Sequence, residues 1–303
     1  MSTKHMDQTN PLDQPTNRLN QSKPTKIGIL LRVALFVLIG YMGMLVFPWF
    51  IQSLVDSLVV TAAMATFASA AVANAIVVRI YERGRLSDLG LAWTTTSLRE
   101  FLQGIGFAAA AAVAIVVAPV AAGVARFEPA PSVEHRLSSV AFIAVVLLFG
   151  AAGEEMLFHG YAFQLLIRSI GAWATILPAA VLFGLAHIGN ENANTLGILN
   201  TMLWGLLLGF AYIRTRALWL PIGLHYGWNL ALPLLGANLS GFTIGVTGYA
   251  LHWSVGGLWS GGGYGPEGSL SVTLIVIVLG VVVHRVFVDP EEAATNEPRP
   301  TEP

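Results

Sequence analysis

Long apolar segments dominate this sequence, and their length limits the folds open to it. Several approach the roughly 20 residues that an α-helix needs to cross the hydrocarbon core of a bilayer. Charged residues are only 11% of the chain, against about 25% in an ordinary soluble domain. We therefore expect an all-α, multi-pass integral membrane protein, a polytopic bundle of about eight transmembrane helices. The predicted spans lie near residues 28–50, 54–79, 101–124, 138–166, 172–189, 195–213, 218–235 and 270–288.

Composition also indicates where the domain begins and ends. Residues 1–26 are polar and predict a disordered cytoplasmic tail, and the acidic, Pro-rich residues 289–303 predict a second disordered tail. The transmembrane domain then covers residues 27–288. A net charge of −1 gives no reason to expect nucleic acid as a partner, and without cysteine the chain has no thiolate nucleophile or thiolate metal ligand.

The basic residues predict how the bundle is oriented. With eight spans and a cytoplasmic N-terminus, 14 of the 16 Lys and Arg residues fall in cytoplasmic segments, and only Arg126 and Arg136 fall outside. An odd number of spans would destroy this asymmetry. We therefore expect both termini in the cytoplasm.

Two adjacent carboxylates, Glu154 and Glu155, interrupt the fourth predicted span. A carboxylate at membrane depth costs about 2.5–3.5 kcal/mol on insertion scales, so two side by side indicate a functional site. Because Glu155 and His159 are four residues apart, they share one helix face, and Glu154 points about 100° away.

Two later spans carry further polar pairs at the same spacing. Phe183 and His187 are four residues apart, and so are His225 and Asn229. A carboxylate with a neighbouring histidine can activate water, and an amide or imidazole can stabilise an oxyanion. A metal could activate the water instead. Glu154, His187 and His225 would then be its ligands, as in many catalytic zinc sites. Both versions hydrolyse a peptide bond.

Each residue alone also fits a structural role. A single intramembrane His or Asn commonly links two helices by a hydrogen bond, and one carboxylate could be the counter-ion of Arg168 or His159. Phe183 suits plain packing. Adjacent carboxylates are harder to explain in this way, because they repel each other and one must bind something or stay protonated. The set as a whole therefore favours an active site.

The order of these motifs resembles the CAAX prenyl protease and bacteriocin-processing family, also called the abortive-infection family, of intramembrane endopeptidases. Its E-E-x-x-x-R, F-x-x-x-H and H-x-x-x-N motifs correspond to GEEMLFHGY, LFGLAHIGN and GLHYGWN, with the motif core near residues 138–235. RLSDLGLAW and GGGYGPEGS also resemble bacterial members. One departure is His159, which stands where the family usually has Arg.

The resemblance implies a role for each matched residue. Glu154 would activate water with His187, His225 and Asn229 would bind the oxyanion and orient the substrate, and Glu155 would orient its neighbours. His159 and Phe183 would support them. Arginine is a fixed bidentate partner for a carboxylate, whereas His is not, so His159 would hold Glu155 less firmly.

The resemblance also implies partners and a location. The expected substrate is a membrane-embedded or lipid-anchored peptide or protein in a bacterial plasma membrane, and the cofactor is either none or zinc. The alternatives are a non-catalytic binding or immunity scaffold and a proton-coupled transporter.

Helix lengths add one structural expectation. At about 1.5 Å per residue, Glu154 lies about 21 Å from Arg168, whereas His225 lies only about 12 Å from residue 217. Straight helices would not bring these groups to one depth. Either the fourth and fifth spans extend beyond the bilayer, which we favour, or they are tilted and broken.

Overall fold

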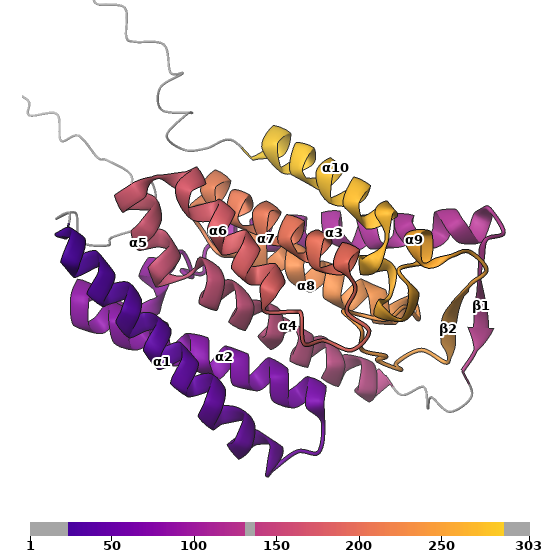
Figure 1. Ribbon diagram of the computed structural model, residues 1–303, viewed down its shortest axis with the longest axis horizontal. Coiled ribbons are helices and arrows are strands. Elements are labelled where there is room, and N and C mark those ends of the chain that lie inside the picture. The colour runs from indigo at the N-terminus through magenta and orange to yellow at the C-terminus, as the bar shows by residue number, and fades with distance from the viewer. Residues whose placement is uncertain (1–23, 131–136, 288–303) are drawn as a thin grey trace, which may run out of the picture.

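The computed structural model describes residues 24–130 and 137–287, and their main architecture is a helical bundle (Figure 1). The fold class predicted from sequence is confirmed. The α-helices are α1 Lys26–Gln52, α2 Leu58–Val77, α3 Thr95–Ala121, α4 Leu137–His159, α5 Tyr161–Ile170, α6 Ala172–Leu185, α7 Thr195–Thr215, α8 Trp219–Leu234, α9 Gly257–Ser260 and α10 Leu270–Val286.

Shorter elements connect these helices. A π-helical turn, Val78–Glu82, continues α2, and 3₁₀ turns cover Leu86–Leu89, Gly262–Tyr264 and Pro266–Gly268. The two strands β1 Ala125–Pro129 and β2 Tyr249–Trp253 pair antiparallel, with Arg126 opposite His252. This β1–β2 ribbon was not predicted from the sequence. It joins the end of α3 to the long segment 236–269 between α8 and α10.

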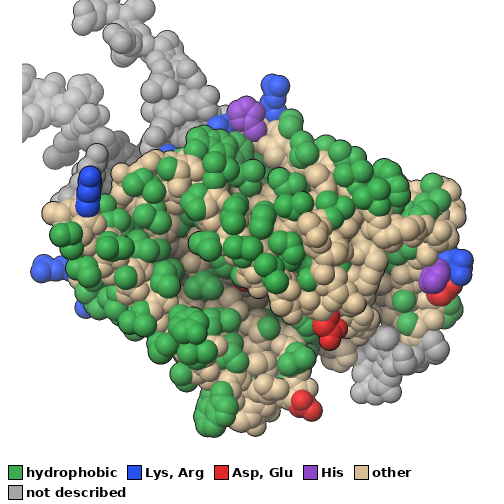
Figure 2. All heavy atoms as spheres, viewed as in Figure 1, with side chains coloured by type: hydrophobic (Ala, Val, Ile, Leu, Met, Phe, Trp, Pro, Cys, Tyr) green, Lys and Arg blue, Asp and Glu red, His purple; other side chains and the backbone are tan. Residues whose placement is uncertain are grey.

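Five helical stretches are long and apolar enough to cross a membrane: Lys26–Gln52, Leu58–Glu82, Thr95–Ala121, Leu137–Ile170 and Thr195–Thr215. Each of the eight predicted spans contains a helix, but α6, α8 and α10 are shorter, so the count of eight stays a prediction. Hydrophobic side chains cover much of the face seen in Figure 2. The domain boundaries also stay predictions, and both predicted tails lie largely outside the described residues.

Helix α4 lies between α2 and α8, and its second half, which carries the acidic pair, is buried or half-buried. It packs against α2 on one side and against α8 on the other, while α3 lies along α8 and α6 along α7 (Figure 1). A Cβ on Gly153 would lie 2.6 Å from the Phe67 backbone nitrogen, so the α2 and α4 backbones nearly touch beside Glu154.

A G-x-x-x-G pattern holds α8 against α3. A Cβ on Gly223 would lie 2.3 Å from the Phe101 carbonyl oxygen, and one on Gly227 would lie 2.7 Å from the Ile105 carbonyl oxygen. Small residues at this spacing let helices in a membrane approach backbone to backbone. His225 lies between the two glycines in sequence, and its side chain reaches α4 instead.

The fourth predicted span is not one continuous helix, because it breaks at Gly160 between α4 and α5. Asn74 of α2 satisfies the backbone groups that the break leaves free. Its Nδ2 donates to the Met156 carbonyl at 2.8 Å, and its Oδ1 accepts from the Tyr161 amide at 2.8 Å. The structure therefore shows the break that was one of the two alternatives, while the favoured extension beyond the bilayer stays a prediction.

A second contact fixes the start of α5. The Tyr161 hydroxyl donates to Glu82 at 3.0 Å, and Arg32 of α1 forms an ion pair with the same Glu82 oxygen at 2.9 Å. The guanidinium of Arg32 also lies 4.8 Å from the centre of the Tyr81 ring. The orientation of α5 thus depends on α1 and on the end of α2.

Candidate active site

Glu155 is the buried anchor of the site. Its side chain has no exposed surface, and the ring nitrogens Nδ1 of His159 and His225 lie 2.7 and 2.8 Å from its two carboxylate oxygens. The predicted one-face pairing of Glu155 with His159 is thus seen directly. His159 occupies the place expected for Arg and supplies one hydrogen-bond donor to the carboxylate, where a guanidinium could supply two.

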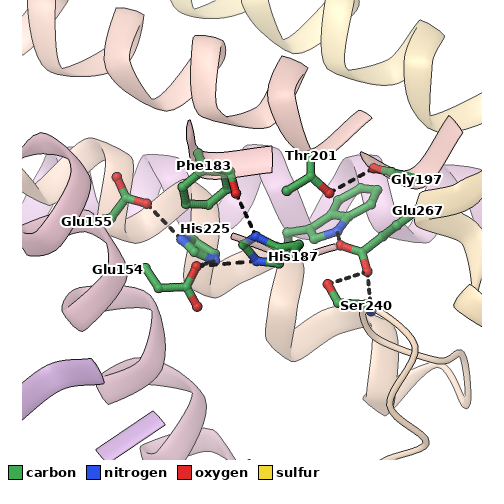
Figure 3. Close-up of polar contacts among 10 residues, drawn as sticks. Glu154, Glu155, Phe183, His187, Gly197, Thr201, His225, Ser240 and Glu267 are labelled. Atoms are coloured by element: carbon green, nitrogen blue, oxygen red, sulfur yellow. Dashed lines mark hydrogen bonds and ion pairs between the residues drawn. The ribbon is translucent and has the colours of Figure 1, made fainter. Parts of the chain in front are cut away.

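Glu154 lies on the same turn of α4, with 27% of its side chain exposed but with its Oε2 atom buried. His187 Nε2 lies 3.7 Å from Glu154 Oε2, and His225 Nε2 lies 4.0 Å from the same oxygen (Figure 3). Residues from α4, α8 and the turn after α6 therefore meet at one carboxylate oxygen, although they are up to 71 positions apart in sequence.

The hydrogen bonds of the two histidines indicate which nitrogen carries a proton. His187 Nδ1 lies 2.8 Å from the Phe183 carbonyl oxygen. A carbonyl oxygen only accepts, so Nδ1 of His187 is the donor and, in the neutral ring, Nε2 keeps its lone pair. Nδ1 of His225 faces the Glu155 carboxylate, which in its ionised form also only accepts, so Nδ1 is the donor to it. Both rings therefore present Nε2 to Glu154.

His187 was predicted to lie in the helical span 172–189, but in the structure it lies in the turn after α6. Helix α6 ends at Leu185, and the His187 amide donates to the Gly184 carbonyl in the turn that follows. Phe183 does more than fill space, because its carbonyl accepts from His187. Its ring also lies 5.1 Å from the His187 ring and 5.9 Å from the His225 ring.

A cavity of about 330 Å³ surrounds the Glu154 carboxylate. Its apolar part includes residues of α1 and α2, such as Met44 and Val59, and its polar part includes Asn229 one turn after His225. In Figure 2 the surface is hollowed between the α1–α2 pair and α6. Among the described residues, the lining contains carboxylates and histidines but neither Lys nor Arg. The structure thus brings all five predicted catalytic residues to one region.

Sequence reasoning missed one acidic residue of this region, Glu267. It follows α9 and lines the same cavity. The Trp228 indole donates to its Oε1 at 3.0 Å, the Ser240 hydroxyl donates to Oε2 at 2.9 Å, and the Ser240 amide donates to Oε2 as well (Figure 3). Burial raises the pKa of Glu267, while these hydrogen bonds and the charge of His187 act in the opposite direction. The sequence carried one signal, the similarity of GGGYGPEGS to bacterial relatives.

Glu154, His187 and His225 were also predicted as possible metal ligands. Glu154, His187 and His225 have the ligand types of a catalytic zinc site, in which the ligand atoms lie about 2.0–2.2 Å from the metal. In the described ranges 24–130 and 137–287, however, no three His, Asp or Glu side chains are grouped so that they could hold a metal ion. The predicted metal role of Glu154, His187 and His225 therefore stays a prediction, and the reaction proposed for this site uses the side chains alone.

These features define an integral membrane protein whose helices enclose a glutamate–histidine cavity. The family model described as type II CAAX prenyl endopeptidase, Rce1-like, matches residues 136–231, about a third of the chain. The matched segment contains all three motifs, so the predicted similarity to CAAX prenyl proteases is confirmed there. Comparisons with curated proteins and with solved structures gave no match. At the level of the family, the match supports a CAAX-protease-like intramembrane endopeptidase.

Proposed function

We propose that this protein hydrolyses a peptide bond of a membrane-associated substrate with water activated by Glu154 and His187. One observation carries the proposal. The Nε2 atoms of two histidines face a single carboxylate oxygen of Glu154, inside a cavity that is partly apolar. That oxygen has no hydrogen-bond partner among the described residues. Because the oxygen is also buried, it needs a polar partner, and in the proposed reaction that partner is the attacking water.

In the proposed reaction, Glu154 accepts a proton from water as the water oxygen attacks the carbonyl carbon of the substrate. The C–N bond then breaks, and the proton passes from Glu154, directly or through His187 Nε2, to the departing amine. The proton balance closes, because water supplies one proton to the amine and a hydroxyl to the new acid.

The oxyanion needs donors on the other side of the carbonyl. We assign this role to Asn229 and to His225 in its imidazolium form, which can donate from Nε2 while Nδ1 donates to Glu155. A carboxylate on the far nitrogen of a histidine stabilises such an imidazolium. Glu155 would therefore act through His225, with His159 as its second partner. In this proposal the two adjacent carboxylates have separate roles: Glu154 is the base, and Glu155 stabilises the imidazolium of His225.

The cavity lining suggests the substrate class. Apolar side chains from α1, α2 and α4 surround one side of Glu154 and suit a membrane-embedded or lipid-anchored peptide. The asymmetry of basic residues supports a bilayer orientation with both termini in the cytoplasm, and we place the protein in a bacterial plasma membrane.

The test uses purified protein in liposomes and a library of membrane peptides, with and without a C-terminal prenyl group. Glu154→Gln keeps the shape of the side chain but removes the base, and His187→Ala removes its partner. We expect each to lower kcat/KM about 10²–10⁴-fold, the usual contribution of a general acid–base group. Glu191→Gln and His252→Ala are the matched controls, since both side chains are exposed and lie outside the cavity lining.

If Glu154→Gln and His187→Ala both cleave as well as the parent, the protease proposal fails. Metal analysis of the same samples separates a metal-free reaction from a zinc-dependent one. Zinc bound at one ion per chain and needed for cleavage would contradict the metal-free mechanism, while leaving the peptidase activity in place.

A further inference from the structure

Glu267 is a buried carboxyl group that the proposed reaction does not use. Only 8% of the residue is exposed, and it lies outside the segment that matches the family model. A buried carboxylate is tolerated only where hydrogen bonds compensate for its lost hydration. Here three donors do so, one from Trp228 and two from Ser240. Such an arrangement needs a reason.

These bonds join parts of the chain that meet at one end of the cavity. Trp228 belongs to α8 and directly precedes Asn229, whereas Ser240 belongs to the segment 236–269. The backbone carbonyl of Glu267 accepts a further hydrogen bond from Asn200 of α7, at 2.7 Å. Trp228, Ser240 and Glu267 all line the cavity. One residue therefore connects two helices to the segment that closes this end.

The backbone of Ser240 is a second, independent sign that this contact matters. Its φ angle is +48°, a left-handed conformation that costs a residue with a side chain some strain. Such a conformation persists only where the surroundings hold it in place. The amide and the hydroxyl of Ser240 both donate to Glu267, so the carboxylate is one of the groups that hold this turn, together with the backbone hydrogen bonds between Leu239 and Phe242.

We propose that Glu267 is a positioning residue of the peptidase site, which fixes the segment 236–269 across the end of the cavity and fixes Trp228 beside Asn229. This inference rests on the proposed function. Glu267 acts through Trp228, whose ring packs 4.9 Å from the ring of Trp204, another residue of the cavity wall. Without the carboxylate, the indole loses its acceptor and the oxyanion side of the cavity loses its fixed wall.

The first experiment measures kcat and KM of Glu267→Gln, with Glu191→Gln as the control. An amide in place of the carboxylate presents a donor to one of the three donors, so at least one contact is lost. We expect kcat to fall about 10- to 100-fold, the effect of a small misplacement of reacting groups, while Glu191→Gln stays within twofold of the parent. An unchanged kcat in Glu267→Gln would overturn the proposal.

Trp228→Phe tests whether Glu267 acts through the indole. If it does, the double variant Trp228→Phe/Glu267→Ala loses no more kcat than Glu267→Ala alone, because Ala already removes the acceptor of the indole. Losses that multiply would mean that the two residues act separately, and the proposal would fail.

The absence of cysteine from the chain allows a test of positioning against chemistry. In Ser240→Cys/Glu267→Cys, the two introduced thiols are the only ones, and dibromobimane can join them. If Glu267 acts by holding the segment, the cross-link restores kcat at least tenfold over the same variant before cross-linking, although the indole of Trp228 still lacks its acceptor. If cross-linked protein of unchanged melting temperature stays as inactive as before, holding the segment is not the role of Glu267 and that part of the proposal is overturned.

Hydrogen exchange gives a readout that does not depend on cleavage. We expect faster exchange across residues 236–269 in Glu267→Gln than in the parent or in Glu191→Gln. Unchanged exchange would overturn this inference even if the peptidase is confirmed. Faster exchange in a protein without Glu154-dependent cleavage would instead reject the proposed function and leave the structural role of Glu267 in place.

Discussion

The break between α4 and α5 depends on one amide side chain, and replacing it tests how the site is built. Asn74→Leu keeps the number and branching of the side-chain heavy atoms but removes both hydrogen bonds across the break. The Met156 carbonyl and the Tyr161 amide are then left without the partners that lie 2.8 Å away in the parent. Asn74 is completely buried, so water cannot replace them.

The expected cost follows from these two contacts. A buried backbone group left without a partner costs about 1–3 kcal/mol, so two give about 2–6 kcal/mol. Side-chain hydrogen bonds between membrane helices average only about 0.6 kcal/mol, because the unfolded chain finds other partners in the membrane. The first estimate predicts a loss of at least about 2 kcal/mol, and the second predicts about 1 kcal/mol for two such bonds. We expect the larger cost, because here the lost partners belong to a broken backbone.

The measurement is the free energy of unfolding in detergent micelles, followed by circular dichroism. Thr61→Val is the control on the same helix, since its buried hydroxyl has no hydrogen-bond partner among the described residues. We expect this control to be neutral or slightly stabilising. If Asn74→Leu loses less than about 1 kcal/mol, twice the average for such bonds, the break does not depend on Asn74 and the reasoning is refuted.

Two further predictions concern α4. Gly153→Ala places a methyl group 2.6 Å from the Phe67 backbone nitrogen, whereas Gly150→Ala meets the Ala63 methyl group at 3.3 Å and its Cα at 3.7 Å. The free energy of unfolding should fall by about 1–3 kcal/mol for Gly153→Ala and by less than half of that for Gly150→Ala. Equal effects would argue against the closer α2–α4 contact at Gly153. His159→Leu removes one of the two histidines that bind the buried Glu155 and should cost about 3–5 kcal/mol. His159→Gln, which keeps a donor, should recover part of this loss, and equal stabilities of the Leu and Gln variants would show that the hydrogen bond is unimportant.

The helices and part of the site could be predicted from sequence because they depend on local patterns. Apolar runs gave the helical segments, and the i, i+4 spacing placed His159 beside Glu155. The break at Gly160 could not be predicted, since a glycine in an apolar helix is often tolerated. Asn74, which satisfies the backbone groups at the break, lies more than 80 residues earlier in the chain.

The positions of His187 and Glu267 also could not be predicted from the sequence, for two different reasons. The apolar pattern continues past the end of α6, so it did not reveal that His187 lies in a turn. Glu267 comes from an irregular segment with no periodicity, and only the folded chain brings it to Trp228. Neither position follows from the spacing of neighbouring residues.

The contacts at the α4–α5 break determine which parts of the chain are needed in a fragment that carries the site. A fragment made of the matched residues 136–231 would contain every motif residue, from Glu154 to Asn229. It would lack Asn74, Glu82 and Arg32, which fix the start of α5. The recognisable motifs and the parts that orient them are therefore encoded in different stretches of the chain. We therefore expect the N-terminal helices to be needed for the correct folding of the matched segment. If the two parts were expressed separately, they would have to associate before Glu155 and His159 are correctly placed.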